Sequence, residues 1–147
     1  MDYTDGYELP STYYRVAAKG IIRDDAGRIL AVADHTGTYE LPGGGWEHDE
    51  DFETCLKREI KEELGVGASI IGSLLFTYRG IGAGKQIMLR IVAEAKLASH
   101  DFDLDNDEVT SVRFVGRDEF LVLNWCDEDR EVVEHVDELW PPVEKKG

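Results

Sequence analysis

The chain has 147 residues, of which 31 are acidic and 16 are basic, so its formal net charge is −15. With 42% hydrophobic residues it has the composition of one globular domain, spanning 1–147, with a proper core. No apolar run reaches the roughly 20 residues that cross a bilayer, and the acidic N-terminus does not resemble a signal peptide. The charge argues against a nucleic-acid polymer as partner, because no basic patch is available for its phosphates. A phosphorylated small molecule fits this charge if a divalent cation bridges the two.

Short segments rich in apolar and β-branched residues alternate with turn signals along the chain. The segments 13–22 and 28–34 flank the turn "RDDAG" and predict a hairpin, with Gly27 as its residue of positive φ. Strands on both sides of the first predicted helix indicate a mixed α/β fold rather than a strict βαβ repeat. The remaining predicted elements are strands at 37–42, 69–80, 85–97 and 109–116, and helices at 49–64 and 127–140.

The two cysteines, Cys55 and Cys126, fit neither a metal-binding spacing nor a disulfide framework. We expect both to be reduced packing residues, which favours a cytoplasmic protein. The four histidines also lack the paired spacing that is typical of a metal site.

The first predicted helix carries carboxylates on the side that its apolar residues select for burial. With Phe52 at zero and about 100° per residue, Leu56 falls at about 40°. By the same stepping, Glu59, Glu62 and Glu63 fall at about 340°, 280° and 20°. Carboxylates on a partly buried face must be paired, protonated or bound to a cation, and basic side chains are scarce in this chain. Mg²⁺ or Mn²⁺ would suit such oxygen ligands, whereas the alternative is a solvated acidic face with a ragged amphipathic pattern.

The spacing from Gly44 to Val66 is a glycine, five residues, Glu50, seven residues, and then "REIKEELGV". This stretch resembles the Nudix box, GX5EX7REUXEEXGU with U apolar, at every defined position. The context matches as well, because "ELPGG" enters the box and a strand-rich segment follows it. The resemblance implies a Nudix-type α/β/α sandwich with a mixed β-sheet. It also implies Mg²⁺-dependent hydrolysis of the pyrophosphate in a nucleoside diphosphate that is linked to another moiety, X.

The resemblance implies roles for individual residues of the box. The side chains of Glu59, Glu62 and Glu63 would be ligands of the metal ion. Gly44 would add its backbone carbonyl, and Arg58 would hold the carboxylates by pairing with Glu59 or Glu62. Three further residues would support the geometry of the box: Glu50, Gly43 and Gly65.

Hydrolysis also requires a general base that takes a proton from water. Within the box, Glu59 and Glu62 are candidates for this base. Outside the box, the acidic loop 103–109 is the best place for a base or a further metal ligand. Glu108 is the first choice there and Asp107 the second, while Glu94 on the preceding strand is the third. The alternative interpretation of this loop is a hydrophilic turn.

Several aromatic and basic residues are candidates for contact with a base or a phosphate, although aromatic residues in strands more often belong to the core. They are Tyr39, Tyr78, Arg79 and Trp46. The chain's small size suits a small nucleotide as partner, either a nucleoside triphosphate, oxidised ones included, or a nucleotide sugar. Dimers are common in the family, so a homodimer is one expectation.

Two other functions compete with this hypothesis. The first is an isomerase of the kind that acts on isopentenyl diphosphate, but those enzymes depart from the full box. The second is a non-catalytic nucleotide-binding module that acts as a sensor or regulator. Such modules usually lack box glutamates, and all of them are present here.

Overall fold

The computed structural model describes residues 13–82 and 86–143. The first ten residues, for which no signal peptide is expected, lie outside this part. Residue 85, where a strand is predicted to begin, also lies outside it. Within the described part, no helix is both long enough and apolar enough to cross a membrane.

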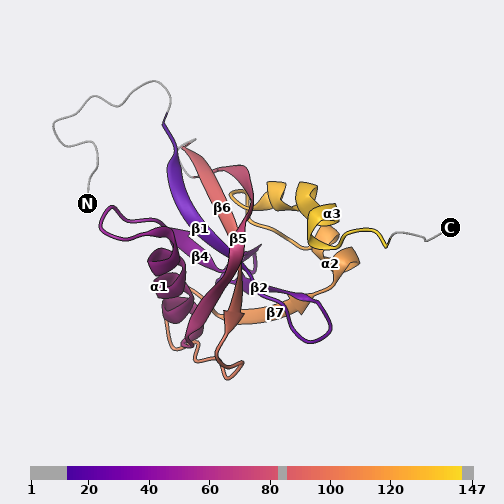
Figure 1. Cartoon of the computed structure of the whole chain (residues 1–147), viewed down its shortest axis with the longest axis horizontal. Coiled ribbons are helices and arrows are strands. Elements are labelled where there is room, and N and C mark those ends of the chain that lie inside the picture. Colours follow the sequence, from indigo (N-terminus) through magenta and orange to yellow (C-terminus); the bar gives the residue numbers. More distant parts are fainter. Residues whose placement is uncertain (1–12, 83–85, 144–147) are drawn as a thin grey trace.

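The elements follow the predicted alternation of strands and helices along the chain (Figure 1). The strands are β1 (Arg15–Ile21), β2 (Ile29–Ala33), β3 (Tyr39–Glu40), β4 (Gly43–Gly45), β5 (Ala68–Ile81), β6 (Ile87–Leu97) and β7 (Ser111–Val115). The helices are α1 (Phe52–Leu64), α2 (Arg117–Val122), the 3₁₀ helix η2 (Arg130–His135) and α3 (Val136–Leu139).

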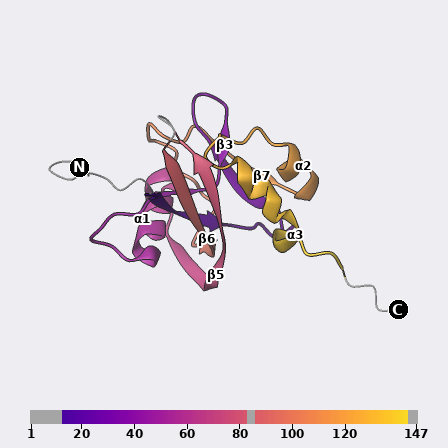
Figure 2. The same cartoon turned by 90° about the horizontal axis from the view of Figure 1, so that it is seen from above.

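The strands form two sheets. The four-stranded sheet has the order β4-β1-β6-β5, and the three-stranded sheet has the order β3-β2-β7. β1 and β6 run parallel while the other paired strands run antiparallel, so the larger sheet is mixed. Figures 1 and 2 show α1 on one side of β5 and β6 and α3 on the other. The predicted α/β fold with a mixed sheet between helices is therefore confirmed.

Two clusters of buried apolar side chains lie on the two sides of the four-stranded sheet. The first includes Leu56 and Ile60 of α1, and the second includes Trp125 and Phe120 near the C-terminal helices. β1 is buried on both faces because its alternate residues enter different clusters. Helix α1 is thereby fixed against a strand in the middle of the sheet.

The predicted hairpin between 13–22 and 28–34 is correct only next to its turn. β1 and β2 belong to different sheets, and only a short ladder remains where the chain crosses, with Arg23 opposite Ile29. β1 instead pairs with β4 and, in parallel, with β6, which lies some 70 residues further along the chain. The turn itself was correctly placed, since Gly27 has φ 77°.

The predicted helix at 127–140 is only partly correct. Helical structure begins at Arg130 and is 3₁₀ as far as His135. Asp129 turns inward, where it is fully buried and accepts a hydrogen bond from the Leu41 N–H, so it cannot take part in a regular surface helix. The sequence pattern also missed the short strand β4 and the helix α2.

Candidate active site

Helix α1 begins and ends where local side chains dictate. Oδ1 of Asp51 accepts a hydrogen bond of 2.8 Å from the Thr54 N–H, which caps the first turn. Gly65 ends the helix with φ 73°, and its N–H donates to the Lys61 carbonyl at 3.0 Å. Only glycine adopts this left-handed conformation without strain, so the last turn, which carries Glu62 and Glu63, has a fixed end.

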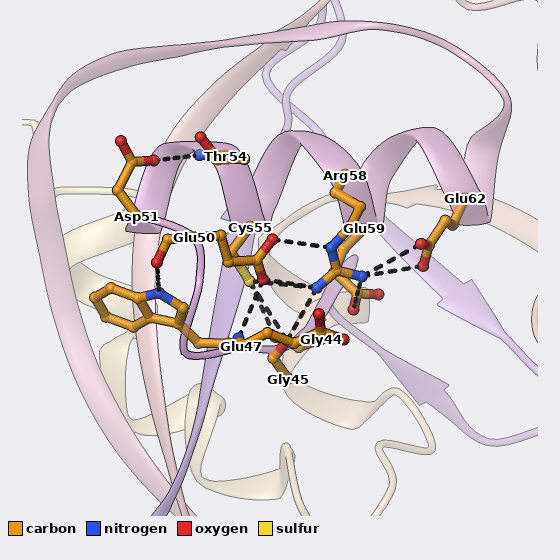
Figure 3. A network of polar contacts seen from close by, with 11 residues as sticks. Gly44, Gly45, Glu47, Glu50, Asp51, Thr54, Cys55, Arg58, Glu59 and Glu62 are labelled. Atoms are coloured by element: carbon orange, nitrogen blue, oxygen red, sulfur yellow. Dashed lines mark hydrogen bonds and ion pairs between the residues drawn. The ribbon is translucent and has the colours of Figure 1, made fainter. Parts of the chain in front are cut away.

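Arg58 lies at the centre of the polar network that joins α1 to the loop before it (Figure 3). Its Nε and Nη2 donate to the two oxygens of Glu50 at 3.0 and 2.8 Å. Its Nη1 donates to Glu59 at 3.0 Å and to Glu62 at 3.3 Å. Nη2 also donates to the Gly45 carbonyl at 3.2 Å. One planar guanidinium thus orients three carboxylates and the glycine-rich strand at the same time.

This arrangement goes further than the predicted pairing of Arg58 with Glu59 or Glu62, because Arg58 contacts both and Glu50 as well. The hydrogen bonds from Arg58 lower the pKa of Glu50 from 4.5 to about 2. Glu50 is therefore ionised throughout the neutral range, as a supporting carboxylate needs to be.

The three box glutamates differ in their exposure. Glu63 is buried, with 2% of its surface exposed, whereas the side chains of Glu59 and Glu62 are 13% and 52% exposed. Oε1 of Glu63 accepts a hydrogen bond of 2.7 Å from the Gly43 N–H. The predicted burial of the glutamate face is thus correct for Glu63, and largely for Glu59, but not for Glu62.

Burial raises the pKa of Glu63 to about 8, although Lys19 and the Gly43 N–H both favour its ionised form. Burial also raises the pKa of Glu59, and the nearby carboxylates of Glu62 and Glu108 add to this, while Arg58 opposes it. The protein's own cations therefore do not fully compensate the negative charge of these two glutamates.

The strand β4 consists of three glycines because it is closely approached on both sides. Gly43 has φ 130°, and a Cβ there would lie 2.0 Å from the Ala18 carbonyl oxygen. A Cβ on Gly44 would lie 2.5 Å from Cδ of Glu59. The absence of side chains lets the backbone of β4 lie directly against the carboxylates of α1.

This donor set fits a hard divalent cation. Carboxylate oxygens and a backbone carbonyl are the ligand types that Mg²⁺ and Mn²⁺ prefer. Cys55 lies beside this backbone, with its Sγ 3.8 Å from the Gly44 oxygen, but burial raises the pKa of its thiol to about 12. Cys55 is therefore a neutral thiol and not a thiolate ligand for a softer metal.

The acidic loop before β7 is fastened to the C-terminal end of α1. Nδ2 of Asn106 donates to the Glu63 carbonyl at 3.1 Å, and the Asp103 N–H donates to the Leu64 carbonyl at 2.9 Å. Oδ1 of Asn106 in turn accepts from the Glu108 N–H at 2.9 Å. Glu108 is exposed, and its charge reaches Glu59. Glu108 therefore influences the pKa of Glu59, and its role in the site stays a prediction.

The other predicted residues lie at different places. Glu94 pairs with Arg23 at 3.9 Å. Tyr39 is half-buried against the second apolar cluster, and Trp46 donates its indole N–H to the Glu50 carbonyl at 2.7 Å. A hollow of about 340 Å³ brings two more of them together, and it is lined by Tyr14, Thr77, Tyr78, Arg79, Leu89, Glu131, Glu134 and His135.

Tyr78 belongs mainly to the core, with 4% of its surface exposed. Its hydroxyl has no hydrogen-bond partner of standard geometry in the described part of the chain, and burial raises its pKa. A ring that is buried in this way offers little surface on which a base could stack, so the structure does not favour that prediction for Tyr78. Arg79 beside it also lines the hollow.

A buried charged cluster next to the box was missed by the sequence reasoning. Lys19 donates to the carbonyls of Leu41 and Gly43 at 3.0 and 3.3 Å, and lies 3.8 Å from both Glu40 and Asp129. Arg90 also donates to Asp129, at 3.1 Å. A lysine inside the apolar run "RVAAKGI" was the one available signal.

Glu40 and Asp129 of this cluster lie with Cys126 at distances suitable for a metal ion. Lys19 already lies beside both carboxylates, and burial raises the pKa of the Cys126 thiol to about 12. We therefore assign these charges to internal ion pairs that hold the segment at Leu41 and Gly43.

Comparison with known proteins agrees with this fold. The NUDIX domain family matches residues 13–136, which is most of the chain, and the chain belongs to this family. A MutT-like protein of Streptomyces ambofaciens is 41% identical over 75 residues, covering 48% of each chain. An 8-oxo-dGTP diphosphatase of Haemophilus influenzae is 41% identical over 56 residues, covering 35% of this chain and 41% of its own. The matches thus span about half the length of these relatives or less.

Among solved structures, a MutT protein from Methanosarcina mazei Go1 superposes with a TM-score of 0.74 at 20% identity. The superposition covers 91% of this chain and 100% of that one. At this level of identity the likeness concerns the fold alone. The resemblance drawn from residues 44–66 is confirmed by the family match.

Proposed function

We propose that this protein hydrolyses the pyrophosphate linkage of a nucleoside diphosphate joined to another moiety, X, with Mg²⁺ or Mn²⁺ as cofactor. The observation that carries the proposal is that Arg58 contacts Glu59 and Glu62 while Glu63 accepts a hydrogen bond from the glycine strand β4, against which Glu59 also lies. The raised pKa values of Glu59 and Glu63 are consistent with it, because burial disfavours their ionised forms and a bound cation would offset this.

In this proposal, the metal ligands would be Glu59, Glu62 and Glu63 together with the carbonyl of Gly44, and Glu108 would be either a further ligand or the general base. A bound divalent ion neutralises the pyrophosphate and lowers the pKa of water. Arg58 holds the carboxylates in place through the contacts described above, and Glu50 holds Arg58. Gly43 and Gly65 support the backbone at the two ends of the site.

The general base takes one proton from the attacking water, whose oxygen forms a new bond to phosphorus as the bridging oxygen leaves. Glu108 is the first candidate for this base because it is exposed and its charge reaches Glu59. Glu59 and Glu62 are the alternatives within the box. The products are a nucleoside phosphate and the phosphate of X.

A nucleoside triphosphate, oxidised ones included, or a nucleotide sugar is the proposed substrate. The name of the Haemophilus influenzae relative, an 8-oxo-dGTP diphosphatase, favours the first of these. Arg79 is the proposed contact to the nucleotide because it lines the hollow. Tyr78 lines the same hollow but is buried, and Tyr39 packs against the second apolar cluster.

A small-molecule nucleotide, and not a nucleic-acid polymer, is the proposed partner, in line with the net charge of −15. A homodimer stays a prediction. A cytoplasmic location is also proposed, and it agrees with the free thiols of Cys55 and Cys126.

A hydrolysis screen tests the proposal. Nucleoside triphosphates, their 8-oxo forms and nucleotide sugars are incubated with Mg²⁺, and released phosphate or pyrophosphate is measured. Turnover of at least one compound, its loss in EDTA and its return on adding Mg²⁺ are expected. Glu62→Gln should lower kcat by at least about 10²-fold. Glu53→Gln is the matched control, because Glu53 lies on the same helix and, within the part of the chain that the structure describes, pairs only with Lys57, at 2.8 Å.

A blank for the whole panel would contradict the proposal. It would favour the non-catalytic binding module, which binds nucleotide without hydrolysing it.

A further inference from the structure

Arg15 is the first residue of β1, and its guanidinium lies against the glycine strand β4. A Cβ built on Gly45 would lie 2.9 Å from Nη2 of Arg15. In the antiparallel pair of β1 and β4, Ala17 lies opposite Gly45, so Arg15 reaches diagonally across the ladder. The charged group of Arg15 therefore lies beside Gly45, the residue that follows Gly44 in β4.

Arg15 and the box glutamates flank β4 from opposite faces. Successive residues of a strand point to opposite faces of its sheet. A side chain on Gly44 would run into Glu59 of α1, whereas one on Gly45 would run into Arg15. β4 is an outer strand of its sheet, with β1 as its only strand partner among the described residues. A ligand that lies across this edge meets carboxylates on one side and a guanidinium on the other.

The positive charge of Arg15 is not paired with an acidic side chain among the described residues. Its side chain is exposed and forms no hydrogen bond or ion pair with any described residue, although the chain has 31 acidic residues. Lys19 and Arg90 lie on the same face of the sheet, but both are buried and paired with Asp129. Within the described part of this face, Arg15 thus carries the uncompensated positive charge.

We propose that Arg15 contacts phosphoryl oxygens of the bound diphosphate from the face of β4 opposite to the metal ligands. A guanidinium offers two parallel N–H donors to a phosphate, which gives orientation as well as charge. The proposed function supplies the nature of the ligand, and this inference rests on it to that extent. Gly45 gives the fork the space beside the backbone that a side chain would fill.

The test uses magnesium imidodiphosphate. This pyrophosphate analogue carries no nucleobase, and its P–N–P bridge resists hydrolysis. Binding to the full chain is measured by calorimetry for the wild type, Arg15→Gln and Arg15→Lys. Arg28→Gln is the matched control, because Arg28 is also exposed and, among the described residues, pairs only with Asp24, at 2.8 Å. The control removes the same unit of charge at a distance from β4.

Arg15→Gln should weaken binding roughly 10- to 100-fold, and Arg15→Lys should recover part of this loss, since lysine keeps the charge without the fork. Arg28→Gln should change the affinity less than about twofold, because its charge is distant and screened. Mn²⁺ affinity without the analogue should be the same in Arg15→Gln and the wild type. That result separates contact with the ligand from mere support of β4.

Equal affinities for wild type and Arg15→Gln would overturn the inference, as would an equal loss in Arg28→Gln or no binding by the wild type. A parallel hydrolysis assay separates this failure from that of the proposed function. Turnover that Arg15→Gln leaves unchanged would refute the role of Arg15 alone. If analogue binding depends on Arg15 but the protein hydrolyses none of the compounds, the phosphate contact of Arg15 would be supported and the proposed hydrolytic function refuted.

Discussion

The carboxylate of Glu59 lies where a side chain on Gly44 would have to begin. The distance from an ideal Cβ on Gly44 to Cδ of Glu59 is 2.5 Å, well inside van der Waals contact. Gly44 does not have a positive φ, so backbone strain does not require glycine here. The close approach of Glu59 does.

Gly44→Ala should therefore displace Glu59 without unfolding the protein. The expected effects are a loss of about 1–3 kcal/mol in the free energy of unfolding, from the added methyl group, and a fall of at least about tenfold in Mn²⁺ affinity. Urea unfolding and Mn²⁺ titration measure the two. Gly67→Ala is the control, because its nearest atom beyond the chain neighbours would be 3.9 Å away. Unchanged Mn²⁺ affinity in Gly44→Ala would separate Glu59 from the metal site.

Arg58→Lys should loosen the network around Glu50. Lysine keeps the charge but cannot donate to both oxygens of Glu50 and also reach Glu59. A Tm lower by roughly 2–8 °C is expected at neutral pH. Because the pKa of Glu50 is lowered to about 2, this stabilisation is present above the ordinary value of 4.5 and is lost as the pH falls towards 2. Scanning calorimetry from pH 7 to pH 2 should show the difference in Tm shrinking, and a constant difference would contradict the assignment.

Glu63→Gln should change the pH dependence of stability in the metal-free protein. The pKa of Glu63 is raised from 4.5 to about 8, so between these values the folded protein holds a proton that the unfolded chain has released. The contribution of Glu63 to the free energy of unfolding therefore falls as the pH rises through this window. Glutamine removes that contribution.

The measurement is urea unfolding in EDTA at several pH values between 5 and about 8.5. Glu63→Gln should gain stability relative to the wild type as the pH rises, and should lose Mg²⁺-dependent turnover. A parallel pH dependence in the two proteins would show that Glu63 is not protonated in this range.

Glu108→Gln tests the acidic loop. If Glu108 is the base or a metal ligand, kcat should fall by roughly 10²–10⁴-fold while the Tm stays nearly unchanged, because the side chain is exposed. Asp107→Asn is the control on the neighbouring residue. A larger effect in Asp107→Asn than in Glu108→Gln would exchange their assignments, and steady-state kinetics on the substrate from the screen decides between them.

Helix α1 could be predicted because its signals are local. The apolar residues repeat with the helical period, Asp51 caps the first turn, and Gly65 ends the last one. The mixed fold followed from the same kind of pattern together with the box. The polar contacts of Arg58 were predicted in kind, but the contact with Glu50 eight residues earlier depends on how the loop turns back.

What could not be predicted depends on contacts between distant segments. β1 pairs in parallel with β6, and the sequence of neither strand indicates which strand it pairs with. Asp129 lies in the acidic run "DEDRE", where no local feature separates the one buried carboxylate from its solvated neighbours. Arg15 likewise became noticeable only once Gly45 lay beside it.

The three-residue strand β4 also separates the proposed metal ligands from the proposed phosphate contact. The carboxylates of α1 reach it from one side, while Arg15 reaches it from the other. Side chains on the second side can therefore be exchanged without touching the groups proposed to do the chemistry. Such a layout would let selection, or an engineer, redirect one hydrolytic centre to a new nucleotide by changing residues on that side alone.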